Sequence, residues 1–553
     1  MSPRAGARAP HGDGDAPTRD GIAAAVAVIA VLVAAAFWPA LQAGFLDWDD
    51  QLTVVDNPKL AAPPGELVGW AFGTFFMGHY QPLSWLSLAL DRAIWGLDPL
   101  GFHLTNLLLH LVNSLLVLAL VLAVLERIGA ALQPRPRLLL ATAATLFWAV
   151  HPLRVESVVW VTERRDVLSA ALLLAATWVY LRAAARAGRG AIPVLSPAGS
   201  AIAVLFAASL LAKAGGVVFV PALLLLDLLL RRVERHDVAA WRPLVVEKLP
   251  LLALSAVAVG LAPLAQDATA AMVPWSVHPL ADRLLVMIFG TCYYLLRPWF
   301  TWPLSPLYEL PVPIGPERPL FLVALVLFAA LCLTGALLLW RRRHRVLAFW
   351  ALYLLPLLPV LGLFQSGPQL VADRYSYLPG AVLAGGVAVF VAARLAASSR
   401  RDRRAALVVA ALCVALLAAA TCRYALAWRD TAGLWQHALA VVPSCGFCRE
   451  ALGLEQLRQG DRATGMRTLA EVLRDRPNLM KANAALAREL ERVGELAAAR
   501  EHYLRAHRLR PDLPVFLRRY ADLSERLGDH AAAAAAREQL RRAGAGADRA
   551  GQE

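Results

Sequence analysis

The chain has 553 residues, of which 58% are hydrophobic and only 17% are charged, and it carries a formal net charge of +14. Soluble domains contain about a quarter charged residues, so this composition excludes an ordinary soluble protein and indicates a chain that crosses a membrane several times. The positive charge does not indicate nucleic-acid binding, because the arginines occupy short loops between apolar runs and no basic stripe with interleaved aromatic residues is present.

The N-terminal region comprises a polar segment followed by an apolar run. Residues 1–20 are rich in Gly, Pro and Arg, and we expect a disordered cytoplasmic tail. The run after them is long enough to span a bilayer and lacks a small-residue cleavage site, so we interpret it as an anchor. With this run, the sequence predicts about eleven spans, near residues 22–42, 102–125, 137–152, 165–183, 198–212, 214–230, 247–265, 319–340, 346–364, 377–395 and 404–422.

The distribution of arginine predicts the topology. Loops rich in arginine face the cytoplasm, which places the N-terminus inside and everything after residue 422 outside. Three apolar segments lie between 242 and 341, although only an even number of crossings fits the loops on either side. The weakest, 283–300, contains polar groups and Pro298, so we expect it to be re-entrant or to lie on the outer face. The arginine-bearing loops are those around 182–189, 231–242, 341–345 and 394–404.

The region after residue 422 contains an internal repeat. Three sets of residues recur at intervals of 34: Pro443, Pro477 and Pro511; Gly460, Gly494 and Gly528; and Ala463, Ala497 and Ala531. This period, with a small residue in the second helix and a helix-ending proline, is typical of tetratricopeptide (TPR) units. We therefore predict an all-α chain with a membrane helix bundle over 21–425 and an extracytoplasmic TPR α-solenoid over 426–545. The solenoid would offer a concave surface for a peptide or protein, or alternatively form a packing cap on the bundle.

The six cysteines are too few for a disulfide framework. Four of them lie in or beside apolar runs and are expected to be small core residues: Cys292, Cys332, Cys413 and Cys422. The motif "CGFC", Cys445 to Cys448, opens the first visible repeat and is similar to a redox motif. The βαβ context of such a motif is absent, so a local disulfide or a packing pair is favoured.

Polar residues gather in the first outer loop, 43–101, and in the span after it. The loop opens with four acids and continues into "HYQPLSWLS", which contains His79 and Tyr80. The span has four polar residues at spacings of 3, 4 and 3, which share one helix face. That face forms either interhelical hydrogen bonds or the polar wall of a substrate cavity. The acids are Asp47, Asp49, Asp50 and Asp56, and the helix residues are His103, Asn106, His110 and Asn113.

Further ionisable groups lie where other spans reach the outer side. The stretch "HPLRVESVVWVTERRD" runs from His151 to Asp166, Lys213 lies between two spans, and the weak segment carries Arg297 near its end. Ionisable groups at this depth are costly and usually functional, although snorkelling arginines are an alternative. Guanidinium groups can bind a lipid-linked phosphate, and a carboxylate can deprotonate an acceptor hydroxyl. A transporter would instead place its acids at the bilayer midplane.

Four stretches occur in order ahead of the repeats: "WDDQLTVVDNP", "HYQPLSWLSLALDRAIWGLDPLGFHLTNLLLH", "HPLRVESVVWVTERRD" and "ADRYSYLP". From about residue 40 to 540 the chain resembles bacterial relatives of the transmembrane and tetratricopeptide-repeat O-mannosyltransferases. Those are C-type (GT-C) membrane glycosyltransferases similar to the protein O-mannosyltransferases. The resemblance implies a multi-pass protein of the bacterial inner membrane that takes mannose or another hexose from a polyprenyl-phosphate donor. The acceptor would be a hydroxyl of a protein or glycan, with inversion at the anomeric carbon.

The resemblance also implies roles for individual residues. The acid pair of the first outer loop falls on Asp49 and Asp50, of which Asp49 would be the base and Asp50 would orient it or the acceptor. Two carboxylates so close should raise the pKa of one of them. The cations implied for the donor phosphate are Arg164, Arg165, Arg297, Arg374 and, more weakly, Lys213. The substrate cavity would include His79, Tyr80, His103, Asn106, His151, Glu156, Asp166, Asp373 and Tyr375.

Some features depart from the family pattern or leave alternatives open. Relatives often carry His where Arg154 stands, which leaves the role of a divalent cation open, because fixed arginines can also stabilise a leaving phosphate. Asp56 precedes "NP" and is expected to be a turn residue. One alternative is an oligosaccharide ligase or polymerase that uses a diphosphate donor, and another is a membrane-anchored TPR scaffold without chemistry. In the transferase, the repeats would hold the acceptor near Asp49.

Overall fold

The computed structural model describes residues 18–129, 132–234, 237–267, 273–301, 303–364 and 367–550. Residues 1–17, most of the expected cytoplasmic tail, lie outside the described residues. The chain divides into two compact units. The first comprises Met1–Leu304 and Leu310–Asp430, and the second comprises Ser305–Glu309 and Thr431–Glu553.

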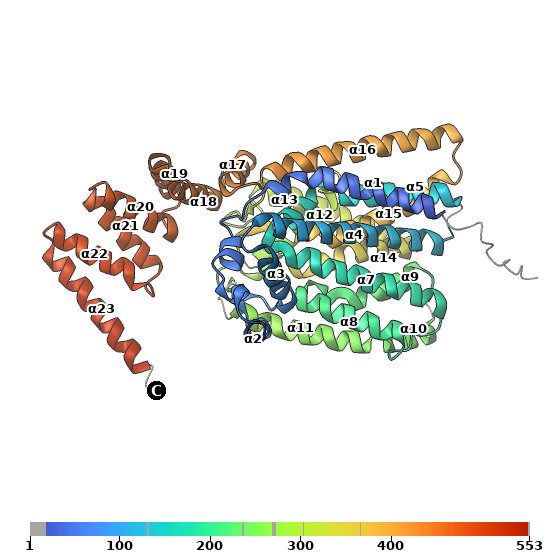
Figure 1. Ribbon diagram of the computed structural model, residues 1–553, viewed down its shortest axis with the longest axis horizontal. Helices are drawn as coiled ribbons and strands as arrows, with labels where there is room; N and C mark the ends of the chain where they lie inside the picture. Colours follow the sequence, from blue (N-terminus) through green and yellow to red (C-terminus); the bar gives the residue numbers. More distant parts are fainter. Residues whose placement is uncertain are drawn as a thin grey trace, which may run out of the picture. The chain divides into compact units, whose positions relative to one another are not determined.

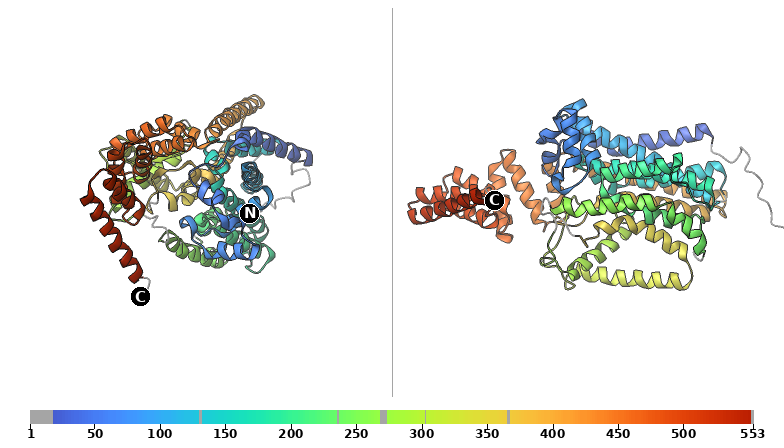
Figure 2. Two further views of the ribbon diagram at one scale, coloured as in Figure 1. Left: turned by 60° about the vertical axis from the view of Figure 1, so that its left-hand side comes forward. Right: turned by 90° about the horizontal axis from the view of Figure 1, so that it is seen from below.

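The first unit is a helix bundle. Figure 1 shows its helices running side by side, and the right view of Figure 2 shows the same arrangement from another direction. The long helices are α1 (Arg19–Phe37), α4 (Pro99–Arg127), α5 (Pro134–Ala149), α7 (Arg164–Ala187), α11 (Leu249–Asp267), α13 (Pro319–Trp340), α15 (Tyr377–Leu395) and α16 (Arg400–Leu426). The shorter helices are α2 (Pro64–Gly73), α3 (Pro82–Trp95), α6 (Val155–Val159), α8 (Pro197–Ala212), α9 (Phe219–Leu229), α10 (Val238–Val246), α12 (Leu280–Leu296) and α14 (His344–Leu354).

Single turns and short strands connect these helices, and several of them carry the residues of interest. Helices α2 and α3 gather at one end of the bundle, in the segment predicted to be the first outer loop (Figure 1). The short elements of this unit are η2 (Trp38–Gln42), η3 (Gln51–Val55), η4 (Pro58–Ala61), η5 (Phe76–Gly78), η6 (Pro152–Arg154), η7 (Val161–Glu163), η8 (Ala214–Val218), η9 (Leu355–Val360), η10 (Asp373–Ser376) and strand β2 (Gln369–Val371).

The apolar helices make this an integral membrane protein. Six helices of the described part are long and apolar enough to cross a membrane, or up to eight if two bent pairs each count as one span. All eleven predicted runs lie on helices, but those over α8, η8–α9 and α14–η9 are shorter than a full span. The all-α membrane fold is therefore confirmed, whereas the count of eleven spans and the re-entrant segment over α12 stay predictions.

Two helices present apolar surface that the rest of the bundle leaves uncovered. The most apolar stretches of α13 and α16 are 6% and 11% buried inside the bundle, and α16 runs along its margin in Figure 1. Cys332 on α13 and Cys413 on α16 are exposed on these helices, and Cys422 is half-buried. The prediction that the four cysteines are core residues is therefore wrong for Cys332, Cys413 and Cys422. It is correct for Cys292, which is buried. A small apolar side chain suits a lipid-facing position as well as a core, so sequence does not distinguish the two.

The second unit is an array of helical hairpins preceded by α17 (Thr431–Val441). The hairpins are α18 (Gly446–Arg458) with α19 (Arg462–Asp475), α20 (Met480–Arg492) with α21 (Leu496–Leu509), and α22 (Pro514–Arg526) with α23 (His530–Ala550). Equivalent helices begin 34 residues apart. Gly460, Gly494 and Gly528 end the first helix of each hairpin with φ angles of 89°, 89° and 80°. Glycine adopts this left-handed conformation without the steric cost of a side chain, which explains its recurrence.

Small residues let the two helices of a hairpin approach closely, but they are not the alanines selected in the sequence analysis. Ala463, Ala497 and Ala531 are exposed. Two other sets of small residues, each recurring every 34 residues, are buried: Gly453, Ala487 and Ala521 on the first helices and Gly465, Ala499 and Ala533 on the second. A Cβ atom on Gly465 would lie 3.0 Å from the carbonyl oxygen of Gly453. A 34-residue period alone therefore identifies the repeat, but it does not identify which small residues lie at the contact between the two helices of a hairpin.

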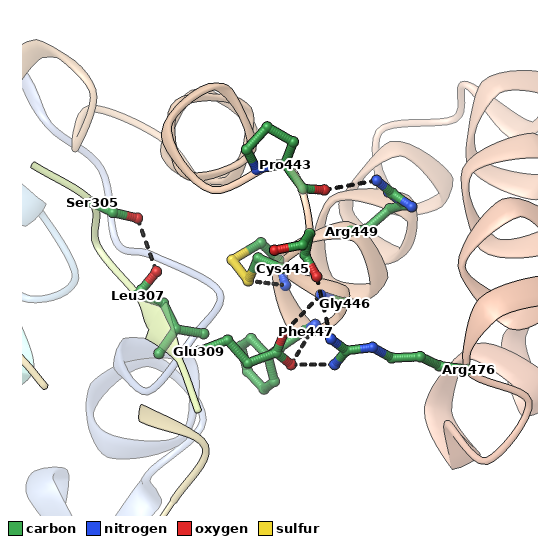
Figure 3. The surroundings of a disulfide bond; sticks show 11 residues. Ser305, Leu307, Glu309, Pro443, Cys445, Gly446, Phe447, Arg449 and Arg476 are labelled. Carbon is green, nitrogen blue, oxygen red and sulfur yellow. Dashed lines mark hydrogen bonds and ion pairs between the residues drawn. A yellow bond between two sulfur atoms is a disulfide. The ribbon is translucent and has the colours of Figure 1, made fainter. Parts of the chain in front are cut away.

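A segment from outside the repeats belongs to the second unit. It contains strand β1 (Tyr308–Glu309), and the Glu309 carboxylate accepts hydrogen bonds from the backbone N–H groups of Gly446 at 2.9 Å and Phe447 at 3.2 Å (Figure 3). Arg476 lies 2.5 Å from the same carboxylate. A carboxylate is favoured here by the partial positive charge of the α18 N-terminus. Cys445 and Cys448 form a disulfide at this helix start, which is one of the two predicted alternatives.

Candidate active site

The acid loop of the first unit is held to the bundle through Asp50. Its side chain is fully buried and accepts hydrogen bonds from the backbone N–H of Leu46 at 3.1 Å and of Thr162 at 2.9 Å. The Thr162 hydroxyl donates a third bond at 2.6 Å. Burial raises the pKa of Asp50 from 3.8 to about 6, although these hydrogen bonds act in the opposite direction. The three hydrogen bonds hold Asp50 in place and thereby orient the loop. The raised pKa means that Asp50 keeps its proton to a higher pH than an exposed aspartate does.

Asp49 differs from its neighbour in burial. Its side chain is half-buried, and its backbone carbonyl accepts from the backbone N–H and the hydroxyl of Thr53, each at 2.8 Å. Trp48 stacks on Trp160, with ring centroids 4.4 Å apart and an angle of 17° between the planes. Asp56 is exposed at the end of η3 and accepts a hydrogen bond from Gln51 at 2.9 Å. The loop thus fixes the Asp49 backbone, and the Asp49 side chain is less buried than that of Asp50.

A cluster of three bases and three acids lies beside the loop. Glu163, which follows Thr162 directly, is fully buried at its centre. Its carboxylate is 2.6 Å from Arg165, 3.3 Å from Arg374 and 3.5 Å from Lys213. Glu156 pairs with the Arg374 guanidinium and accepts from its backbone N–H at 2.9 Å, and Asp166 pairs with Lys213. Because η7 carries both Thr162 and Glu163, one turn of backbone joins the acid loop to the ion cluster.

His79 and Tyr80 lie half-buried, and His79 is close to the ion cluster. Desolvation, followed by the positive charges of Arg165 and Lys213, lowers the pKa of His79 from 6.5 to about 3. His79 is therefore a neutral hydrogen-bonding group at physiological pH. The Tyr80 ring contacts Phe75 edge-on, with centroids 5.8 Å apart.

Aromatic side chains surround Arg374. Its guanidinium carbon lies 5.5 Å from the centroid of the Trp160 ring and 4.9 Å from that of Tyr375. Trp160 is also the ring on which Trp48 stacks, so the aromatic contacts run from the acid loop to Arg374. Buried Asp373 accepts a hydrogen bond from the Tyr293 hydroxyl at 2.5 Å. The "ADRYSYLP" stretch thus contributes one cation and one ring to the same site.

Two of the predicted phosphate-binding arginines lie elsewhere. The Arg164 guanidinium is buried and contacts Asp91 at 2.5 Å, Asn106 at 2.5 Å, Ser87 at 2.8 Å and the carbonyl of Phe102 at 2.9 Å. Arg297 donates to the backbone carbonyls of Phe300 and Pro303 and lies over the Tyr293 ring. Arg164 and Arg165 are adjacent, but consecutive helix residues point about 100° apart, so they face different partners.

The polar face of α4 is buried over all four of its residues. Asn106 donates to the Trp160 carbonyl at 3.2 Å, and Asn113 donates to the Val167 carbonyl at 2.9 Å. The His110 ring bonds the Tyr377 hydroxyl at 2.7 Å and the Ala149 carbonyl at 2.9 Å. His103 is fully buried on the same face. For Asn106, His110 and Asn113 the geometry is that of interhelical hydrogen bonding.

His151 is fixed at the bend between α5 and α6. One ring nitrogen lies 3.1 Å from the Pro298 carbonyl, and the other accepts from the Leu153 N–H at 3.2 Å. Both contacts are with backbone, so His151 joins two segments at this end of the bundle. Within the described residues there is no group of three or more His, Cys, Asp or Glu arranged to hold a metal ion.

Sequence reasoning missed Thr162, Glu163 and Asp91. Asp91 pairs with Arg164, while Thr162 and Glu163 connect the two halves of the site. The stretch "VTERRD" shows that acids and bases are close together there. No sequence signal separates Glu163 from Glu156, because Lys213 and Arg374, two of the three cations around Glu163, are distant from it in the chain.

Several known proteins that are similar to this chain are named protein O-mannosyl-transferases of the TMTC type. Protein O-mannosyl-transferase TMTC4 of Mus musculus is 26% identical over 502 residues, which cover 78% of this chain and 66% of that protein. The Homo sapiens TMTC4 protein is 25% identical over 475 residues, covering 76% and 62%. Protein O-mannosyl-transferase TMTC3 of Homo sapiens is 26% identical over 167 residues, covering 28% and 17%.

The matches extend over much of the chain but not over the whole of its relatives. The chain spans about two thirds of the length of the TMTC4 proteins that it matches. No protein-family model matches it. No solved structure matches it either. With the order of motifs and the membrane bundle, these alignments identify the chain as a relative of the TMTC protein O-mannosyl-transferases.

Proposed function

We propose that the chain is a membrane glycosyltransferase that moves a hexose, such as mannose, from a polyprenyl-phosphate donor to a hydroxyl of a protein or glycan. The observation that supports it best is the adjacency of Thr162 and Glu163. Thr162 holds the acid loop through Asp50, and Glu163 holds three cations. An acid and a cation cluster fixed by one backbone turn suit a reaction that removes a proton at one point and releases a phosphate at another.

The cations would bind the donor phosphate. Arg165, Arg374 and Lys213 each contact a carboxylate now, so their charges are held in place rather than free to move. A polyprenyl-phosphate sugar carries one negative charge, and its leaving group, polyprenyl phosphate, carries a second as the glycosidic bond breaks. Fixed cations aimed at this developing charge stabilise the transition state more than the ground state.

The acid loop would act on the acceptor. In the proposed step the Asp49 carboxylate takes the proton of the acceptor hydroxyl, and the acceptor oxygen forms a bond to the anomeric carbon. The bond from that carbon to the phosphate oxygen breaks, and the electron pair leaves with the phosphate. Attack from the face opposite the leaving group inverts the anomeric carbon. Asp50 remains bonded to Leu46 and Thr162 and keeps Asp49 in position.

The hairpin array would recruit the acceptor. We interpret its three hairpins as a TPR solenoid, on the 34-residue spacing of the helices and the left-handed glycines. The proposed topology places it outside a bacterial inner membrane. An acceptor bound to the solenoid would be present at a raised effective concentration near Asp49.

The test uses membrane vesicles that contain the full chain and a labelled polyprenyl-monophosphate hexose. Loss of a positioned base lowers turnover about 10²–10⁴-fold, which is the expected effect of Asp49→Asn. Asp47→Asn is the matched control, because Asp47 is an exposed acid of the same loop. Transfer from a diphosphate-linked glycan and not from the monophosphate would favour a ligase or polymerase. An Asp49→Asn chain with full cellular function would favour a scaffold.

A further inference from the structure

A large apolar cavity lies within the first unit, away from the acid loop. Its volume is about 740 Å³, and it is lined by residues of α4, α7, α9, α14 and α15. The ionisable groups among its lining residues are Arg231 and Arg345. Residues such as Leu174, Phe349 and Phe390 line the rest with aliphatic and aromatic surface. A space of this kind is suited to a hydrocarbon chain rather than to a sugar.

The two arginines mark one end of the cavity. Arg231 comes directly after α9 and its final turn, and Arg345 is the second residue of α14, which packs against α9. Arg231 has a φ angle of 58°, a conformation in which a side chain is costly and glycine is usual at a helix end. Arg342 has a similar φ angle of 54°, so the backbone conformation alone does not distinguish Arg231, whereas its place in the cavity lining does.

In the described part of the bundle the two arginines are at most weakly neutralised. Arg345 lies 3.9 Å from Glu234, and both side chains are about half exposed, so this pair is weak. Arg231 has no ion-pair partner within the part of the chain that the structure describes. Guanidinium groups bind phosphate oxygens in a bidentate way. The end of the cavity therefore combines two available cations with an apolar interior.

Lys213, one of the cations proposed to bind the donor phosphate, is at the opposite end of the same helix. Lys213 precedes η8 and α9, whereas Arg231 follows them, and these 16 residues rise at least about 24 Å. One lipid phosphate cannot contact both ends at once. The phosphate of a donor bound at Lys213, Arg165 and Arg374 would therefore leave Arg231 and Arg345 unoccupied.

We propose that an anionic glycerophospholipid binds here, with an acyl chain in the cavity and its phosphate on Arg231 and Arg345. The site lies at the end of the bundle where the arginine-rich loops face the cytoplasm in the predicted topology. This lipid would come from the inner leaflet and remain bound during the reaction. It fills the space between α9, α14 and α15 and thereby stabilises the wall of the bundle.

The test measures lipid retention and does not depend on sugar transfer. The full chain is placed in phosphatidylcholine nanodiscs that contain phosphatidylglycerol, then moved to mild detergent, and the bound lipids are counted by native mass spectrometry. The expected result is that phosphatidylglycerol is retained by the unmodified chain. Arg231→Gln with Arg345→Gln should lower retention about tenfold for each charge-assisted bond lost. The matched control is Arg341→Gln with Arg342→Gln, since Arg342 has a φ angle of 54° but does not line the cavity.

A second pair of variants tests the cavity itself. Gly385 lines it, and a Cβ atom there would meet nothing within 4 Å, so Gly385→Leu should fill the space and expel the lipid. Gly335→Leu on α13 is equally open and lies outside the lining, so it should retain the lipid. If the arginine variant fails to fold, the lipid retention of Gly385→Leu compared with Gly335→Leu tests the proposal instead. Equal retention in test and control variants would overturn the proposal, as would selective binding of polyprenyl phosphate in place of phosphatidylglycerol at this site. Either outcome leaves the proposed transferase activity intact.

Discussion

Replacing Glu163 by Gln removes one negative charge from the centre of the ion cluster while keeping the size of the side chain. The carboxylate is fully buried, 2.6 Å from Arg165, 3.3 Å from Arg374 and 3.5 Å from Lys213. At an effective dielectric constant of about 20, each pair has a Coulomb energy of about 5–6 kcal/mol. Desolvation of the buried groups offsets much of this attraction, and removing one partner of a buried pair costs about 3–5 kcal/mol. We expect the free energy of unfolding to fall by that amount.

The assay is denaturant unfolding of the full chain in mild detergent, followed by tryptophan fluorescence, because Trp160 lies beside the cluster. Glu126→Gln is the matched control. Glu126 is 49% exposed and its carboxylate lies 4.0 Å from Arg137, so losing this pair should cost less than about 1 kcal/mol. If Glu163→Gln unfolds at the same denaturant concentration as Glu126→Gln, Glu163 does not hold the three cations and the reasoning is refuted.

Three further predictions concern other charged contacts. The pKa of Asp50 is raised from 3.8 to about 6, so the folded state keeps this proton at higher pH than the unfolded chain. Its contribution to stability therefore falls by about 3 kcal/mol as pH rises from below 3.8 to above 6. The difference in unfolding free energy between the unmodified chain and Asp50→Asn should change by this amount over that pH range. A difference that stays constant with pH would contradict a raised pKa for Asp50. Asp91→Asn leaves the buried Arg164 charge unpaired and should cost about 3–5 kcal/mol in unfolding measurements. Asp98→Asn should cost less than about 1 kcal/mol, because asparagine caps a helix about as well as aspartate and only the negative charge at the α4 N-terminus is lost. Glu309→Gln weakens the contacts with Arg476 and the α18 N-terminus, so limited proteolysis should cleave the 305–309 segment faster than in Glu317→Gln.

Periodic features of the sequence predicted much of the fold. The apolar runs lie on helices, and the 34-residue interval matches the starts of successive hairpin helices. Both signals are local, because a helix and its turn are determined by residues close together in the chain. Predicting the lipid-facing cysteines and the buried small residues would have required knowledge of which helix face is covered. Which face is covered depends on how one helix packs against another, and the recurrence of a residue in the sequence does not show this packing.

The candidate site was harder to predict, because its contacts join distant parts of the chain. Asp50 and Thr162 are separated by 112 residues, and Glu156 and Arg374 by 218. The sequence indicated which outer segments carry ionisable groups but not how they pair. Arg165 and Arg374 lie in the same ion cluster, whereas Arg164 contacts Asp91 and Asn106. Binding of a phosphate by any of them stays a prediction. A guanidinium gives the same sequence signal whether its partner is a carboxylate of the protein or a bound phosphate.

The adjacent acids of the loop have different environments, and that difference bears on their roles. Asp50 is buried with three hydrogen bonds, which makes it a poor candidate to reach an acceptor hydroxyl. Asp49 is half-buried, and its backbone is fixed by Thr53. Two titratable groups separated in this way can divide their functions, since burial rather than residue type determines which one remains accessible. The pair therefore supports a base at Asp49 whose position is set by Asp50 and Thr162, with the ion cluster one residue further along the same backbone.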